Sequence, residues 1–294
     1  MIDVHDTHYL PAGSAAANGC EVEVTPESAG WGYTSLKIVA LPVDGSHEFA
    51  TGDDEVIVLP LQGAVSVEAD GSSCELAGRR GVFAGPTDVA YVGIGHSVRL
   101  RSAEGGRFAL CGARSDRPRP LHHMAATDVP VERRGAGPSS RLVRNFGTPG
   151  ALEANSIIAC EVLTPGGNWS SYPAHKHDEA SEHESELEEI YYFEIAAGPA
   201  GEPGLGYFRT SSSGRTIELL EEVRDRDAVL VPYGWHGPAV AAPGHDMYYL
   251  NVMAGPGSER EWKITDHPQQ AWVRSSWADQ TFDPRLVVVE VDHG

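Results

Sequence analysis

With 294 residues, 41% of them hydrophobic and 22% charged, the chain has the composition of a globular protein of one large domain or two ordinary ones. A formal charge of −20 argues against proteins that bind nucleic acid or anionic membranes, because both need clustered Lys and Arg. It does not exclude a small anionic substrate, since one local arginine can hold a carboxylate.

Short apolar runs separated by Gly, Pro, Asp and Ser predict β-strands along the whole chain, and helical periodicity is scarce. The predicted strands of the first part are Leu36–Leu41, Glu55–Leu61, Ala64–Ala69, Val89–Val92 and Val98–Arg101. Those of the second part are Ser156–Leu163, Glu189–Ile195, Leu205–Thr210, Thr216–Leu220, Ala228–Val231 and Met247–Val252. Ser258–Trp262 is the best candidate for a single helical turn.

The polar segment Ser115–Ser140 separates the two sets of strands and has the composition of a connection between domains. The halves also echo each other, because an acidic residue opens an apolar strand that ends at glycine both after Glu55 and after Glu189. We therefore expect an all-β protein of two related β-domains, residues 1–125 and residues 126–294.

The cysteines Cys20, Cys74, Cys111 and Cys160 form no CxxC pair, which is typical of free thiols in a reducing compartment. The acidic N-terminus has no apolar segment of a signal peptide, and no run has the length of a membrane span. A cytoplasmic protein is the expectation.

Two histidines on alternate positions, His175 and His177, indicate a metal site. Alternate residues share a face only in an extended segment, and Pro173 favours that conformation. Glu189 opens an aromatic strand, and His236 follows a Pro-x-Gly turn. These three imidazoles and one carboxylate, in this order, predict a divalent metal site with positions left open for substrate.

Alternatives exist for each part of this site. A lone HxH on a turn is more often solvated, and His236 could be a packed core histidine. Glu188 is the direct neighbour of the favoured ligand Glu189, and the acidic loop Asp178–Glu186 offers Glu182 and His183. That loop is interpreted either as a mobile, solvated segment or as a lid.

The order His-x-His, Glu before an aromatic strand, then Pro-x-Gly and His resembles the two motifs of the cupin superfamily, although the interval from His177 to Glu189 is longer than usual. Longer stretches resemble the 5-deoxy-glucuronate isomerases of bacterial myo-inositol catabolism, and a related family of uronate ketol-isomerases fits less well. The stretches are Leu10–Ala15, Gly167–Asp178, Leu187–Tyr192, Tyr248–Pro256, Trp272–Arg274 and Trp277–Arg285.

This resemblance implies a bicupin, two tandem jelly-roll-like β-barrel domains with one divalent metal ion per chain in the second. Zinc, manganese, iron and nickel all accept such donors. The implied reaction converts 5-deoxy-D-glucuronate, an aldose acid, to the ketose 5-dehydro-2-deoxy-D-gluconate. Assembly of the chain into a homo-oligomer is a further possibility. In the first half His47 and Glu55 lie near ligand positions without an HxH, so we expect no metal there.

Aldose–ketose isomerisation needs a cation that polarises the carbonyl and a group that carries a proton between adjacent carbons. The candidate proton carriers are Glu161 and Tyr191, and Arg209 is the candidate for the substrate carboxylate, with Tyr248 and Asn251 as polar lining. Other functions stay open: an isomerase of another, pectin-derived uronate, a metal-dependent cupin dioxygenase, or a sugar-binding or storage protein without turnover.

Overall fold

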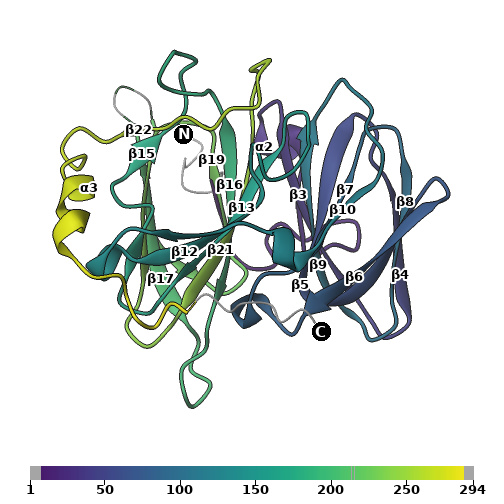
Figure 1. Ribbon diagram of the computed structural model, residues 1–294, viewed down its shortest axis with the longest axis horizontal. Coiled ribbons are helices and arrows are strands. Elements are labelled where there is room, and N and C mark those ends of the chain that lie inside the picture. Colours follow the sequence, from purple (N-terminus) through teal and green to yellow (C-terminus); the bar gives the residue numbers. More distant parts are fainter. Residues whose placement is uncertain (1–7, 213, 215, 288–294) are drawn as a thin grey trace.

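The computed structural model describes residues 8–212, 214 and 216–287, and its regular secondary structure is almost entirely antiparallel strands (Figure 1). A seven-stranded sheet has the order β1-β19-β16-β21-β13-β12-β11. Its strands are β1 (Tyr9–Leu10), β11 (Val131–Arg134), β12 (Arg141–Gly147), β13 (Ile158–Thr164), β16 (Glu188–Ile195), β19 (Ala228–Val231) and β21 (Met247–Ala254).

A six-stranded sheet faces the seven-stranded one within the second half of the chain, in the order β18-β17-β20-β15-β22 with β14 also paired to β20. It comprises β14 (Trp169–Ser170), β15 (His175–Lys176), β17 (Leu205–Ser211), β18 (Glu218–Arg224), β20 (Trp235–Ala241) and β22 (Thr265–Asp266). Large side chains such as Tyr191, Phe193 and Phe208 fill the space between these two sheets. In the described part of the chain no strand pairing joins them, so this barrel is an open sandwich.

The first half forms a nine-stranded sheet that folds over on itself through the long strand β5. Its strands are β2 (Val22–Val24), β3 (Thr34–Leu41), β4 (Gly45–Ala50), β5 (Asp54–Ala69), β6 (Ser72–Arg79), β7 (Val89–Val92), β8 (Ser97–Ser102), β9 (Gly106–Arg114) and β10 (His122–Met124). The register of β5 shifts near Pro60 and Gly63, where such irregularities let a strand bend. The fold encloses a second core between its two faces.

The helices whose bounds the structure describes are single turns: α2 (Pro26–Ala29), α3 (Val273–Ser276), η1 (Val82–Ala84), η2 (Ala126–Asp128), η3 (Gly137–Ser139) and η4 (Trp277–Asp279). The helical turn predicted for Ser258–Trp262 is wrong, because that segment has neither helix nor strand. None of the helices in the described residues is long and apolar enough to cross a membrane. The four cysteines are free, and three of them are buried.

The two halves lie side by side, with their largest sheets in contact through a third apolar core (Figure 1). Both faces of β13, β16 and β21 are therefore buried, one inside the second half and one against the first. Glu55 of the first half accepts hydrogen bonds from the Tyr91 hydroxyl and from the backbone amides of Asn155, Ser156 and Ile157. A carboxylate so fully engaged is a structural tie between the halves.

The predicted strands all overlap observed ones, and two of them, Glu55–Leu61 and Ala64–Ala69, are parts of the single strand β5. The segment predicted as a connection contains β10, which pairs with β7 of the first half, and β11, which pairs with β12 of the second. β1 pairs with β19, so Tyr9 and Leu10 belong to the seven-stranded sheet of the second half. The division near residue 125 stays a prediction.

Candidate metal centre

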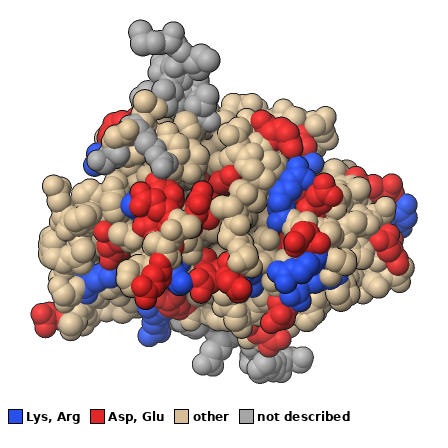
Figure 2. All heavy atoms as spheres, turned by 90° about the horizontal axis from the view of Figure 1, so that it is seen from above, with Lys and Arg blue, Asp and Glu red and all other residues tan. Residues whose placement is uncertain are grey.

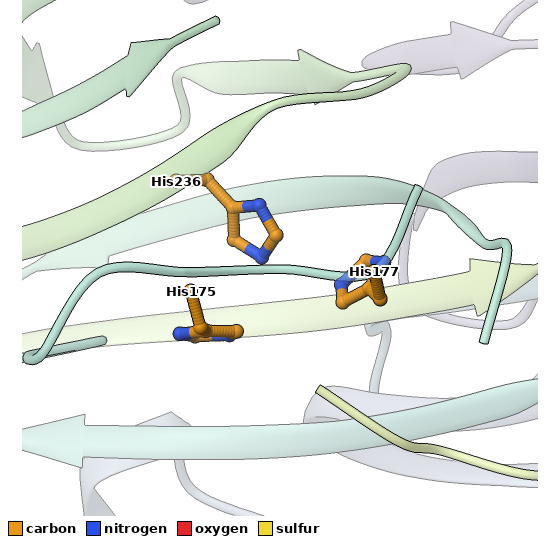
Figure 3. A group of neighbouring side chains, drawn as sticks. All are labelled: His175, His177 and His236. Carbon is orange, nitrogen blue, oxygen red and sulfur yellow. The ribbon is translucent and has the colours of Figure 1, made fainter. Parts of the chain in front are cut away.

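His175, His177 and His236 lie together inside the second half, with one nitrogen of each within 4.8 Å of the others (Figure 3). His175 and His177 come from one extended segment, and β15 pairs with β20 so that His175 is directly opposite His236. The ring centroids of His175 and His177 are 4.5 and 4.7 Å from that of His236. The predicted convergence of three imidazoles is thus present in the structure.

Backbone carbonyls orient each of the three rings. The Nδ1 atoms lie 3.5, 3.1 and 3.0 Å from the carbonyl oxygens of Pro173, Leu187 and Gly234 for His175, His177 and His236 respectively. Such contacts fix the tautomer and leave Nε2 free to bind a cation. The Nε2 atom of His236 is buried and makes no well-aligned hydrogen bond, although Glu189 is close to it, which suits a metal ligand.

Glu189, and not Glu188, lies beside these rings. An oxygen of the Glu189 carboxylate is 3.0 Å from His177 Nε2 and 3.1 Å from His236 Nε2, and the residue is buried. Glu188, one residue earlier and on the opposite face of β16, accepts hydrogen bonds from the backbone amides of Gly32, Tyr33 and Thr34 in the first half. Strand alternation therefore separates the two neighbouring carboxylates.

Two groups of the cluster, His175 and Glu189, are held in the charge states that a cation needs, whereas, against the effect of burial, contact with Glu189 raises the pKa of His177. Burial, together with the two neighbouring imidazoles, lowers the pKa of His175 well below its usual value. Burial alone would raise the pKa of Glu189, but its contacts with His177 and His236 lower it to about 2. A neutral imidazole and an ionised carboxylate are the ligand forms that bind a divalent metal.

A narrow cavity of about 30 Å³ adjoins the cluster. Its polar lining consists of Arg134, Arg141, Cys160, Ser171, His175, Glu189, Tyr191, Tyr249, Asn251 and Trp262. The Ser171 hydroxyl is 3.3 Å from the Tyr191 hydroxyl and 3.1 Å from that of Tyr249. Burial raises the pKa of Tyr191 well above its usual value, so this phenol stays protonated.

Two of the residues predicted around the site, Tyr191 and Asn251, are brought to this cavity, and three are not. Glu161 of β13 and Tyr248 of β21 lie on the sheet face that is turned away from the histidines. There the Tyr248 hydroxyl donates a 2.6 Å hydrogen bond to Glu161. Arg209 is on the outer face of β17, with 44% of its side chain exposed, and pairs with Glu218 at 2.9 Å. The expected inward orientation of these three residues is wrong, because each has the opposite strand parity to the residues inside.

The sequence-based prediction missed the two arginines of the cavity. Arg134 ends β11 and Arg141 begins β12, both in or next to the segment that composition marked as a connection. Arg134 is held by both oxygens of Glu132, at 2.8 and 2.6 Å. Their only signal in the sequence is an unusual density of arginine in a chain with a large excess of acid.

The acidic loop after His177 is held by a buried carboxylate. Glu184 accepts hydrogen bonds from the Asp178 and Glu179 amides and from Lys176 Nζ, which points away from the histidines. Glu182 and His183, the alternative ligands in this loop, are exposed. They lie outside the histidine cluster.

Comparisons with known proteins agree with this architecture. The family model described as the KduI/IolB family matches residues 8–273. The chain belongs to the KduI/IolB family. It is 37% identical over 272 residues to a 5-deoxy-glucuronate isomerase of Geobacillus kaustophilus, covering 91% of this chain and 95% of that one. The isomerase of the same name from Bacillus subtilis strain 168 is 33% identical over 270 residues, with 90% and 96% covered.

Solved structures place this KduI/IolB chain among bicupins. An IolB-like protein of Salmonella typhimurium is similar with a TM-score of 0.83 and 31% identity, covering 90% of this chain and 98% of that one. A variant oxalate decarboxylase of Bacillus subtilis has a TM-score of 0.61 at 11% identity, with 88% and 79% covered, which shows the fold alone. The predicted all-β bicupin fold and the resemblance to this family are confirmed, and the chain is an isomerase.

Proposed function

We propose that this protein is a metal-dependent aldose–ketose isomerase that converts 5-deoxy-D-glucuronate to 5-dehydro-2-deoxy-D-gluconate. The substrate is taken from the shared name of relatives that match nearly the whole chain. The observation that carries the proposal is the convergence of three imidazoles and Glu189 beside a narrow polar cavity, which His175 and Glu189 line. On the face in Figure 2, acidic side chains are interspersed with Lys and Arg, which agrees with a small ligand rather than a nucleic acid.

His175, His177, His236 and Glu189 would hold the cation, since three nitrogens and one carboxylate suit zinc, manganese, iron or nickel. A divalent cation bound there would polarise a carbonyl oxygen and stabilise the negative charge that develops on it. The chain's own contribution is to hold the ligands on β15, β16 and β20 and, for His177, directly after β15, with the side chains of His177, Glu189 and His236 buried.

Tyr191 remains the proposed proton carrier. Its buried hydroxyl lies beside the hydroxyls of Ser171 and, through it, Tyr249, so a proton could pass along neutral groups to and from a substrate oxygen. We withdraw Glu161 from this role, because Arg79 and Tyr248 hold its carboxylate at the junction of the two halves. Asn251 stays as polar lining of the substrate cavity.

The test is incubation of the purified protein with 5-deoxy-D-glucuronate in deuterated water, followed by NMR, with and without a chelator. The expected result is formation of the ketose acid, lost with chelator and restored by added metal. A parallel incubation with a pectin-derived uronate and an oxygen electrode separate the alternatives. Absence of turnover by metal-loaded protein, or turnover that consumes oxygen, would contradict the proposal.

A further inference from the structure

Arg141 is a buried cation for which the described residues provide no carboxylate within ion-pair distance, the nearby Glu132 being paired with Arg134. Only 5% of the residue is exposed. Its Nη1 donates a 2.8 Å hydrogen bond to the Ser139 carbonyl, and its guanidinium lies 5.4 Å from the centroid of the Trp277 ring. Burial lowers the pKa of this guanidinium to about 10, so it remains charged at neutral pH. An unpaired buried charge is costly, and a protein rarely retains one without a use for it.

The neighbouring arginines show how unusual this is. Arg134, in the same cavity, is neutralised by both oxygens of Glu132. Arg79 and Arg144, buried at the junction of the halves, both contact Glu161. Arg141 therefore keeps a full positive charge available to the cavity that the metal ligands also line.

Two further donors around the same cavity lack acceptors. The Nδ2 atom of Asn251 and the Nε1 atom of Trp262 are buried without a hydrogen-bond partner. Buried donors are nearly always paired, and these two residues line the cavity together with Arg141 and His175. A cation and two unpaired N–H groups around one cavity suit a ligand that is anionic and rich in oxygen.

We propose that Arg141 binds the carboxylate of the substrate, and that Asn251 and Trp262 hydrogen-bond oxygen atoms of the same molecule. The assignment rests on the proposed function in one respect: the anionic group is the carboxylate of a sugar acid whose carbonyl end faces the histidines. A planar guanidinium can donate two parallel hydrogen bonds to a carboxylate, which gives both affinity and orientation. Arg141 thus binds the substrate carboxylate in place of Arg209, whose side chain lies on the outer face of β17.

The test compares R141M with R209M, which removes an exposed arginine of the same half. The probe is the acid obtained by borohydride reduction of the substrate, which retains the carboxylate but has no carbonyl to isomerise, and its methyl ester is the uncharged reference. Binding to metal-loaded protein is measured by calorimetry, and metal content and Tm are recorded for each variant.

We expect R141M to bind the acid about 100-fold more weakly than wild type, with the affinity for the ester changed less than about threefold. Metal content should be unchanged, and Tm should hold or rise, because an unpaired buried cation has been removed. R209M should behave like wild type. R141K, which keeps the charge but not the planar fork, should lose at least about tenfold and serves if R141M is difficult to produce.

Equal loss of acid and ester affinity in R141M, a lower Tm, or an acid affinity within threefold of wild type would overturn the assignment. If R141M does not fold, an R141K acid affinity within threefold of wild type overturns the assignment instead. The two proposals fail separately. Wild type that binds the acid through Arg141 but turns over no substrate refutes the isomerase function, whereas turnover unaffected in R141M refutes the arginine assignment.

Discussion

The ion pair between Arg79 and Glu161 joins the two halves through two buried charges. Arg79 ends β6 of the first half and Glu161 is in β13 of the second, and their side chains are 3% and 2% exposed. Arg79 also donates to the carbonyls of Pro60 and Gly85, and Glu161 accepts from the Tyr248 hydroxyl. Replacing Arg79 by methionine therefore leaves the buried Glu161 carboxylate without its closest cationic partner.

The magnitude follows from what remains around Glu161. Breaking one partner of a buried pair costs about 3–5 kcal/mol of unfolding free energy. Arg144 stays 3.7 Å from the carboxylate and Tyr248 keeps its hydrogen bond, so we expect the lower end, about 3 kcal/mol, for Arg79→Met. At roughly 2 °C per kcal/mol for a chain of this size, Tm should fall by about 6 °C.

Differential scanning calorimetry at neutral pH measures this, with Arg209→Met as the matched control. Arg209 has an exposed partner, and exposed pairs contribute about 1 kcal/mol or less. Adding Glu161→Gln to Arg79→Met should recover part of the loss, because the stranded charge is gone. If Arg79→Met and Arg209→Met melt within 2 °C of each other, the reasoning about buried charge at the junction is refuted.

Three further predictions follow from the same contacts. Burial would raise the pKa of Glu161, but Arg79 and Arg144 lower it below its usual value. The loss of unfolding free energy in Glu161→Gln, measured by urea titration, should therefore have its full size above about pH 4.5 and become smaller at lower pH. A loss that does not depend on pH would contradict this. Trp262 lines the narrow cavity, so binding of a sugar acid there should change the surroundings of its ring. Titrating substrate acid into metal-loaded protein should change tryptophan fluorescence, and Trp262→Phe should abolish most of the change. An unaltered signal in that variant would exclude Trp262 from the binding site. A bound metal should stabilise the folded protein by about 4 kcal/mol at a metal concentration 1,000 times Kd, so its removal by chelator should lower Tm. In His177→Ala the chelator should have little effect on Tm. An equal fall in Tm in both proteins would exclude this site.

Strand alternation explains which site residues could be predicted from the sequence. On β16 the parity counted from Glu189 places Tyr191 inside, as observed. On β21 the same reasoning should have excluded Tyr248 once Asn251 was chosen, because residues three apart point to opposite faces of a strand. Both faces of this strand are apolar and buried, so composition alone does not mark which faces the histidines.

The remaining failures come from contacts between distant segments. Packing of the two halves buries Glu161 against Arg79. The sequence around β13 does not predict this contact, because the two residues are 82 positions apart. Arg141 directly follows the predicted connection Ser115–Ser140 and begins β12, a strand that was not predicted from the sequence. The four metal ligands could be predicted because neighbouring residues indicate the backbone at each. Pro173 precedes the HxH pair, an aromatic strand follows Glu189, and a Pro-x-Gly turn precedes His236.

The most direct test of the metal centre is anomalous diffraction from crystals of the metal-loaded protein. We expect one strong peak per chain, at bonding distance, about 2.0–2.2 Å, from nitrogens of His175, His177 and His236 and from the Glu189 carboxylate. A peak at any other place in the chain, a second equally strong peak in the first half, or no peak after loading would contradict the account.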